Sequence, residues 1–484
     1  MQFYCANIVN YIRCISLFHY LCYQNIYQSM IELKLTTGEQ RLLTPVKNSN
    51  GQYELVDSTN TIQMVVALKN THIEVIDKCN IDIDAYNKED LSSRLDLLAV
   101  EIIENEQSGI EHNEYEEPAE VTPYDPELIK VHQKQFSIKF IDEMIENGDI
   151  DFTPDFQRHF VWNSVQKSKL IESLLLRIPL PLFYFAEDNE GRLTIVDGLQ
   201  RLTTIKEFMR NEFPLKNLEY LNDGVKGRYY KTNLEKGQQG IDPKYYRWFN
   251  MTQFAVNVID PSSPFKVKYD IFRRINTGGR PLRNQEIRNC LASISLRKLL
   301  NEMISLDEFK SATNLSVKPD RMEDQEVALR FITFYDAFKK DASLQTSYSG
   351  YMENTLDDAT ETYYKVHEDT HKRYVSLFRN AMKNAEYLFG SRYAFRKVRS
   401  EHIGEARKQL FNKALFVAWA SQLAEIPYDS IMKYPKEYLL PIFAKRLETD
   451  GKLMYYLSYG TNGKANLEYI FRVVAEIIND NLSL

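Results

Sequence analysis

The chain has 484 residues, of which 44% are hydrophobic and 26% charged, so it is expected to fold into two or three globular domains, and a fibrous protein is excluded. Its net charge of −7 excludes the overall basic bias of a nucleic-acid coat protein, so any contact with DNA must be local. The five cysteines include no CxxC pair. A disulfide scaffold and the common structural zinc motifs are therefore excluded, and we expect a cytoplasmic protein.

Residues 1–29 are rich in aromatic side chains and contain three of the five cysteines. Asn7, Arg13 and His19 interrupt the apolar runs, so none approaches the ~20 residues that a membrane helix needs. A secretory signal is not expected either, because the basic region that opens one is missing. Two interpretations stay open: a spurious leader that precedes Met30, or a short helix that packs on the body of the protein.

Residues 30–100 alternate apolar and polar side chains between turn signals such as Asn50-Gly51, which predicts a small β-rich domain. Residues 101–130 are predicted to be an acidic linker. Between 101 and 127 the chain has ten acidic residues, three prolines and no Lys or Arg, a composition typical of a solvated, self-repelling segment. The alternative is a DNA-mimicking or autoinhibitory arm that covers a basic surface.

The next block predicts a helix, two strands and a second helix that follows a glycine turn. Asn163 or the residue after it is a suitable N-cap for the first helix. Two short strands, 182–185 and 193–196, are joined by a polar turn. The second strand leads directly into Asp197-Gly198 and a helix with an apolar face.

The first turn of such a helix exposes backbone N–H groups and the positive end of the helix dipole, which together bind anions. Gly198 permits positive φ and the close approach of a phosphate, and the guanidinium of Arg201 can contact two phosphate oxygens. Asp197 can hold Arg201 or share a divalent cation with the phosphates. Further polar groups follow in the same helix, at Gln200, Thr203 and Thr204. The alternative is a helix cap at Asp197 with a surface ion pair to Arg201.

Ordered blocks of this sequence resemble the family that forms the N-terminal half of GmrSD-type modification-dependent restriction endonucleases, a branch of the ParB/sulfiredoxin-like fold. The resemblance rests on Gln157-Arg158 with Phe160-Val161-Trp162, on 178–181 (Ile-Pro-Leu-Pro), on 197–204 (Asp-Gly-Leu-Gln-Arg-Leu-Thr-Thr), on 272–290 and on 320–331. The family signature is Asp-Gly-Gln-Gln-Arg. Leu199 departs from it at the third position, which bears on substrate selectivity more than on phosphate binding.

The resemblance implies that residues 131–315 form a ParB/sulfiredoxin-like nucleotide-binding domain of an α+β protein. Long helical periodicities from about residue 320 to the end predict that residues 316–484 form a mainly helical domain. It also implies NTP binding and, in several members, NTP hydrolysis coupled to DNA restriction or phage defence. On this basis Arg201 binds phosphate, Asp197 orients it or coordinates Mg²⁺, and Gln200 positions the attacking water.

The same resemblance assigns further nucleotide contacts to two other segments. Gln157 and Arg158 are expected to supply a second phosphate contact, and the turn Asn276-Thr277-Gly278-Gly279 is expected to form the opposite wall of the pocket. From the residues alone, the alternatives are a strand-edge ion pair and a plain glycine turn between two helices.

A C-terminal His-Asn-His nuclease, which such restriction enzymes carry, is not expected. Glu401-His402-Ile403 resembles the start of that site, but it lacks the following proline and any histidine further along the chain. His367 and His371 have a spacing that zinc ligands can have, without a third ligand at a recognisable distance, and we expect both to be exposed. Three functions stay open: an NTP-hydrolysing effector, a non-catalytic sensor that partners a separate nuclease, and a ParB-like nuclease.

Lys and Arg outnumber the acidic residues between 365 and 413, with Tyr and Phe among them. Such a cluster suits contact with the DNA phosphate backbone. We expect the contact to involve Arg392, Arg396, Lys397 and Arg399. The alternative is a solvated helix face.

Overall fold

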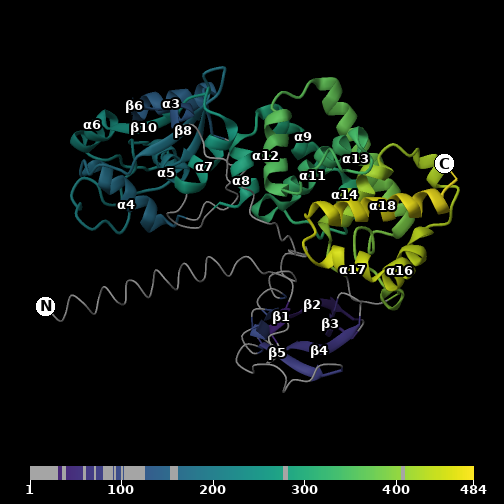
Figure 1. Cartoon of the computed structure of the whole chain (residues 1–484). Coiled ribbons are helices and arrows are strands. Elements are labelled where there is room, and N and C mark those ends of the chain that lie inside the picture. The colour runs from purple at the N-terminus through teal and green to yellow at the C-terminus, as the bar shows by residue number, and fades with distance from the viewer. Residues whose placement is uncertain are drawn as a thin grey trace. The chain divides into compact units, whose positions relative to one another are not determined.

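The structure is a computed structural model that describes residues 31–34, 40–48, 50–57, 61–69, 72–79, 91, 94–96, 98–99, 102, 126–152, 162–275, 282–404 and 409–483. The chain divides into two compact units, one of residues 121–293 and one that joins residues 1–120 to 294–484. Small sheets occur in both units, and the part after residue 293 is helical (Figure 1). The predicted α+β class, with a β-rich N-terminal part and a helical C-terminal region, is confirmed.

A mixed five-stranded sheet forms the centre of the unit 121–293, in the order β6-β10-β8-β9-β7. Its strands are β6 (Val131–Ser137), β7 (Ile150–Asp151), β8 (Phe183–Glu187), β9 (Leu193–Asp197) and β10 (Gln253–Ile259). Strand β10 pairs antiparallel with β6 and parallel with β8, whereas β8 and β9 form an antiparallel hairpin. Buried apolar side chains such as Phe185, Ile195 and Val258 fix the register, because a slip by one residue would expose them.

The helices of this unit are α3 (Ile138–Asn147), α4 (Ser164–Leu175), α5 (Leu199–Met209), α6 (Pro243–Met251), α7 (Phe265–Ile275) and α8 (Asn284–Leu291), with a 3-10 turn η2 (Pro126–Leu128). The predicted start of α4 is confirmed. The side chain of Asn163 accepts hydrogen bonds from the backbone N–H groups of Val165 and Gln166, and the Gln166 side chain accepts one from the N–H of Asn163. These reciprocal bonds satisfy N–H groups that the helix cannot pair internally.

An aromatic cluster anchors the helix that follows the glycine turn. The ring of Phe208 in α5 lies 5.8 Å from that of Tyr230 and 5.6 Å from that of Phe249 in α6, measured between centroids. All three side chains are buried. Since burial of a large apolar side chain contributes about 1.5–3 kcal/mol, the cluster holds α5 firmly against the rest of the unit.

The second unit begins with an antiparallel sheet in the order β1-β2-β3-β4-β5. Its strands are β1 (Ile31–Lys34), β2 (Gln40–Lys47), β3 (Tyr53–Val56), β4 (Ile62–Lys69) and β5 (His72–Asp77). Leu43, Leu55, Met64 and Val66 form its core together with Leu98 and neighbouring apolar residues. The alternation of apolar and polar residues in this segment therefore predicts the sheet correctly.

The remainder of this unit is helical: α9 (Ile294–Ser305), α10 (Asp307–Ala312), α11 (Glu323–Lys340), α12 (Met352–Thr362), α13 (Glu368–Phe389), α14 (Lys413–Leu423), α15 (Tyr428–Ile431), α16 (Leu439–Thr449), α17 (Gly451–Ser458) and α18 (Lys464–Asn481), with 3-10 turns η4 (Asp320–Met322) and η5 (Ser400–His402). Helix α14 is buried along nearly its whole length and packs against α11, α13 and α18. It is the central helix of this region (Figure 1). In the described part of the chain, no helix combines the length and hydropathy that a membrane crossing requires.

The prediction that His367 and His371 are both exposed is wrong for His371. His367 is exposed at the N-cap of α13, but His371 is buried one turn further along. The Nε2 atom of His371 lies 2.7 Å from a carboxylate oxygen of Glu302 in α9. Because this carboxylate pairs with the ring nitrogen, the imidazole can be buried between the two helices.

Candidate functional site

The predicted glycine turn is present between β9 and α5. Gly198 is the N-cap of α5 and has φ 107° and ψ 4°, a left-handed conformation that favours glycine. A Cβ atom at this position would overlap the ring of Phe183 and lie 3.2 Å from Nη2 of Arg201. The turn therefore requires glycine for two reasons, its backbone conformation and its close packing on β8.

Arg201 is buried against the back of this turn, with 9% of its surface exposed. Its Nη1 group donates to the carbonyl oxygen of Pro181, and its Nη2 group donates to the carbonyl of Leu182 at 3.1 Å and to Oδ2 of Asp197 at 2.8 Å. Its guanidinium carbon lies 4.1 Å from the centroid of the Phe183 ring. Burial lowers the pKa of Arg201, and the adjacent Asp197 carboxylate opposes that shift.

These contacts give Arg201 a clear structural role. It ties the segment before β8 to the end of β9, so the glycine turn is held at a fixed position relative to the sheet. The ion pair with Asp197 agrees with the alternative drawn from the residues alone, except that the arginine is buried. A phosphate contact of this guanidinium stays a prediction.

Asp197 is more accessible than its partner. Its side chain is 40% exposed, and Arg201 bonds to one of its two carboxylate oxygens. A hard cation such as Mg²⁺ is commonly held by one or two carboxylates together with the phosphates of a bound nucleotide. Among the described residues, no group of three or more His, Cys, Asp or Glu side chains is placed to hold a metal ion, so a metal here would depend on phosphate oxygens.

The remaining polar groups of α5 differ in accessibility. Gln200 is half-buried in the first turn, and its backbone carbonyl accepts a hydrogen bond of 2.9 Å from the hydroxyl of Thr204. Thr204 is fully buried, so its hydroxyl serves the helix itself. Thr203 is half-buried. Of these three predicted ligand contacts, Gln200 and Thr203 are partly exposed, although Oε1 of the Gln200 amide is enclosed.

Six of the predicted nucleotide-binding residues lie outside the described residues. They are Gln157 and Arg158, and Asn276, Thr277, Gly278 and Gly279. Their assignment to the nucleotide pocket stays a prediction.

Arg396, predicted to contact DNA, is fully buried in the helical region. It donates hydrogen bonds to the carbonyl oxygens of Thr313, Ala394 and Gln409, at 2.6, 2.7 and 2.9 Å. Burial lowers its pKa to about 10, so it is still protonated at neutral pH. In this position it braces three backbone segments and presents no surface to a phosphate.

The other three predicted DNA contacts are half-buried. Lys397 donates to the hydroxyl of Ser458 at 2.9 Å, and Arg399 pairs with Glu54 at 2.9 Å. Both side chains thus have partners within the protein. The prediction of DNA contact by this segment therefore depends most on Arg392.

A cluster that sequence inspection missed lies on α6 and the segment just after α4. The guanidinium carbon of Arg177 and Nζ of Lys244 lie 4.2 and 4.6 Å from the ring centroid of Trp248, and the Tyr245 ring packs edge-on against the same ring at 5.7 Å. Both cations are exposed, and neither has a carboxylate within ion-pair distance among the described residues. The signal in the sequence is the interleaving of basic and aromatic residues in Lys-Tyr-Tyr-Arg-Trp-Phe, 244–249.

Residues 138–293 match the family model described as GmrSD restriction endonuclease, N-terminal domain. The matched residues cover nearly all of the unit 121–293, from the start of α3 to the end of that unit. The resemblance inferred from the sequence blocks is confirmed. Comparisons with curated proteins and with solved structures gave no match.

Proposed function

We propose, on the premise that residues 138–293 form a GmrSD restriction endonuclease N-terminal domain, that this protein is the nucleotide-binding and NTP-hydrolysing component of a restriction-like defence system that acts on DNA. The family match is the observation that carries the proposal. The proposal includes a ParB/sulfiredoxin-like fold for this domain and action in the cytoplasm on incoming DNA.

The phosphates would bind at the first turn of α5. Gly198 has no side chain to cap the helix, so a phosphate would take the place of a side-chain cap at the first turn. Arg201 contributes positive charge from behind the turn, where its contacts with Pro181 and Leu182 keep it fixed. In this arrangement the backbone binds the phosphates directly, and the buried arginine raises the local potential.

Two side chains would act on the reacting phosphate. Asp197 has a carboxylate oxygen to which Arg201 does not bond, which fits a Mg²⁺ ion whose other ligands are phosphate oxygens and water. Such an ion would offset negative charge on the phosphates. Gln200 would position the attacking water by hydrogen bonds from its side-chain amide.

Nucleotide binding can be tested by thermal denaturation of the full chain with each of the four NTPs, with and without Mg²⁺. We expect one or more NTPs to raise the midpoint, since a ligand that binds only the folded state stabilises it. Gln200→Ala should reduce this shift. Gln135→Ala, the same change at an exposed position of β6, is the control. No shift with any NTP, or equal shifts for both variants, would contradict the proposed site.

One observation favours a second candidate function, a sensor that binds nucleotide or DNA without hydrolysis and signals to a separately encoded nuclease. The guanidinium of Arg201 already has three acceptors in the protein, the carbonyls of Pro181 and Leu182 and the carboxylate of Asp197. Direct contact with a transferred phosphoryl group would require loss of one of these bonds. Nucleotide binding without phosphate release would establish the sensor function.

The Arg177, Lys244 and Trp248 cluster is the surface of this domain that best suits DNA. Exposed cations attract DNA phosphates, and a combination of basic and aromatic side chains is typical of surfaces that bind single strands. Lys244→Ala should weaken binding of single-stranded DNA and lower its dependence on salt concentration. Lys226→Ala, at another exposed lysine of the same unit, should leave the affinity unchanged; equal losses for the two variants would exclude this surface.

A further inference from the structure

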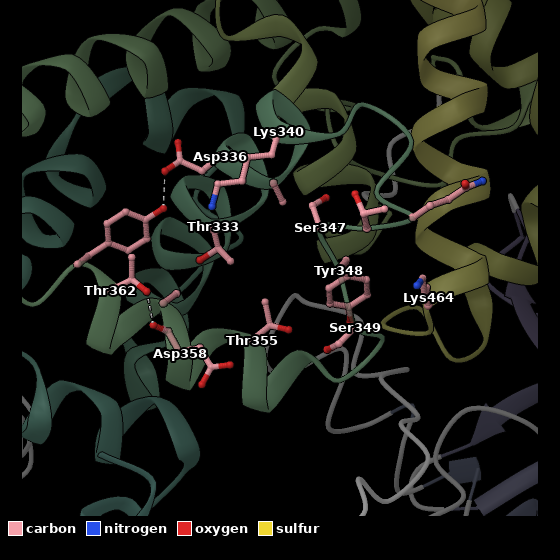
Figure 2. A pocket seen from close by; sticks show the side chains of 15 residues that line it. Thr333, Asp336, Lys340, Ser347, Tyr348, Ser349, Thr355, Asp358, Thr362 and Lys464 are labelled. Carbon is pink, nitrogen blue, oxygen red and sulfur yellow. Dashed lines mark hydrogen bonds between the residues drawn. The ribbon is translucent and has the colours of Figure 1, made fainter. Parts of the chain in front are cut away.

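A polar pocket of about 440 Å³ lies in the helical region, and none of the predicted site residues lines it. Its walls are the C-terminal half of α11, the loop that follows, helix α12 and the start of α18. Figure 2 shows its polar lining: Lys340 and Thr333 come from α11, Thr355 comes from α12, and Lys464 lies on a different wall. The volume lies within the about 300–1,000 Å³ typical of small-molecule sites.

The loop wall is held in place without any ligand. Asp341 accepts hydrogen bonds from the backbone N–H groups of Ser343 and Thr346, at 2.9 and 2.7 Å, and from both hydroxyls. Leu344 and Tyr348 are buried, and the Tyr348 hydroxyl donates to the carbonyl of Asn462. A wall fixed in this way loses little conformational entropy when a ligand binds.

The acidic part of the lining is already supplied with donors. The Oδ2 atom of Asp336 accepts hydrogen bonds from the hydroxyls of Tyr363 at 2.7 Å and Tyr374 at 2.6 Å. Burial and this carboxylate both raise the pKa of Tyr363, so its hydroxyl stays protonated. Both bonds end on one oxygen, so Oδ1 of Asp336 is available to accept a hydrogen bond from a ligand hydroxyl.

The basic part of the lining lacks acceptors. Lys340 and Lys464 are exposed, and neither forms an ion pair with a described carboxylate. The hydroxyl oxygen of Ser347 is enclosed and has no hydrogen-bond partner among the described residues. Lys464 is the first residue of α18, which is 18 residues long and begins after Gly463, so the N–H groups of its first turn have no side-chain cap.

We propose that this pocket binds a phosphorylated sugar. The phosphate would lie between Lys464, Ser347 and the first turn of α18, where donors without acceptors are concentrated. The sugar hydroxyls would bond to Oδ1 of Asp336 and to the threonine and serine hydroxyls of the lining. A cation does not fit as well, because the two lysines repel it and Asp336 is already bonded to two tyrosines.

Isothermal titration of the full chain with ribose 5-phosphate and with glucose 6-phosphate tests the proposal, with ribose and inorganic phosphate as reference ligands. We expect one of the sugar phosphates to bind at least about tenfold more tightly than either reference, because charge-assisted bonds and hydroxyl contacts then act together. Binding by neither sugar phosphate, or equal binding of inorganic phosphate alone, would overturn the proposal.

Variants locate the binding. Lys464→Gln should weaken it at least about tenfold, and Ser347→Ala severalfold. Lys445→Gln, at an exposed lysine of α16, is the matched control and should leave the affinity unchanged. Gln200→Ala should also leave it unchanged, which separates this pocket from the proposed nucleotide site. Unchanged affinity in Lys464→Gln would refute the assignment, because this side chain is exposed and its replacement does not disturb the fold.

Discussion

Replacement of Gly198 by alanine should destabilise the unit 121–293 through two separable effects. The first is the backbone conformation: at φ 107° an L-residue costs about 1–2 kcal/mol relative to glycine. The second is steric, because the new Cβ would overlap the Phe183 ring and crowd Nη2 of Arg201, and overpacking of this kind costs about 1–3 kcal/mol. The sum is about 2–5 kcal/mol.

A second glycine of the same unit separates the two effects. Gly191, in the turn between β8 and β9, also has positive φ, at 82°, but an added Cβ there would have nothing within 4 Å. Gly191→Ala should therefore cost only the backbone term of about 1–2 kcal/mol. The difference between the variants, about 1–3 kcal/mol, measures how tightly the turn packs on β8.

Urea denaturation of both variants and the parent chain measures the free energies of unfolding, and calorimetry measures the thermal midpoints. In calorimetry, Gly198→Ala should lower the thermal midpoint of this unit by on the order of 10 °C, and Gly191→Ala should lower it by a smaller amount. Equal losses in the two variants would show that the Gly198 turn does not pack closely on β8, since only the steric term distinguishes the variants.

Three further predictions concern buried ionisable side chains. Arg201→Met should destabilise the unit 121–293 by about 3–5 kcal/mol, because it leaves two carbonyls and a carboxylate without their donor. The control Arg192→Met, at a half-exposed ion pair, should cost under about 1 kcal/mol in the same denaturation assay. Equal costs for the two variants would contradict the structural role of the buried Arg201. Arg396→Met should also destabilise the helical region by about 3–5 kcal/mol. It should leave the DNA affinity of the folded protein unchanged in a filter-binding assay. A loss of DNA affinity without a loss of stability would show that the Arg396 side chain is accessible to DNA. Burial lowers the pKa of His402 below its ordinary value of 6.5, so the unfolded state binds a proton more readily than the folded state. The contribution of His402 to the free energy of unfolding is therefore present above pH 6.5 and is lost as the pH falls below that value. His402→Gln should remove this pH dependence from denaturation midpoints measured on both sides of pH 6.5, whereas an unchanged pH dependence would assign it to another group.

The local features of the fold could be predicted from the sequence because their causes are local. The capping box at Asn163 depends on a residue three positions away, and the glycine turn at Gly198 depends on its own φ. The strands 182–185 and 193–196 were predicted within two residues of β8 and β9. Each of these signals is contained in a few consecutive residues.

The roles of the buried cations could not be predicted in this way. Arg201 bonds to the carbonyl of Pro181, 20 residues earlier, and Arg396 bonds to that of Thr313, 83 residues earlier. His371 was expected at the surface because the spacing gave no sign of Glu302. Backbone carbonyls and carboxylates that come from distant segments leave no trace in local spacing, so a cluster of basic residues indicates a charged surface even where the fold buries some of its members.

The most direct test of the proposed function is the rate of phosphate release from each NTP by the full chain with Mg²⁺, measured with and without double-stranded DNA. The account predicts release from at least one NTP, a higher rate when DNA is present, and a loss of about a hundredfold in Gln200→Ala with Gln135→Ala unaffected. Absence of release with all four NTPs, or an undiminished rate in Gln200→Ala, would contradict catalysis at the turn between β9 and α5.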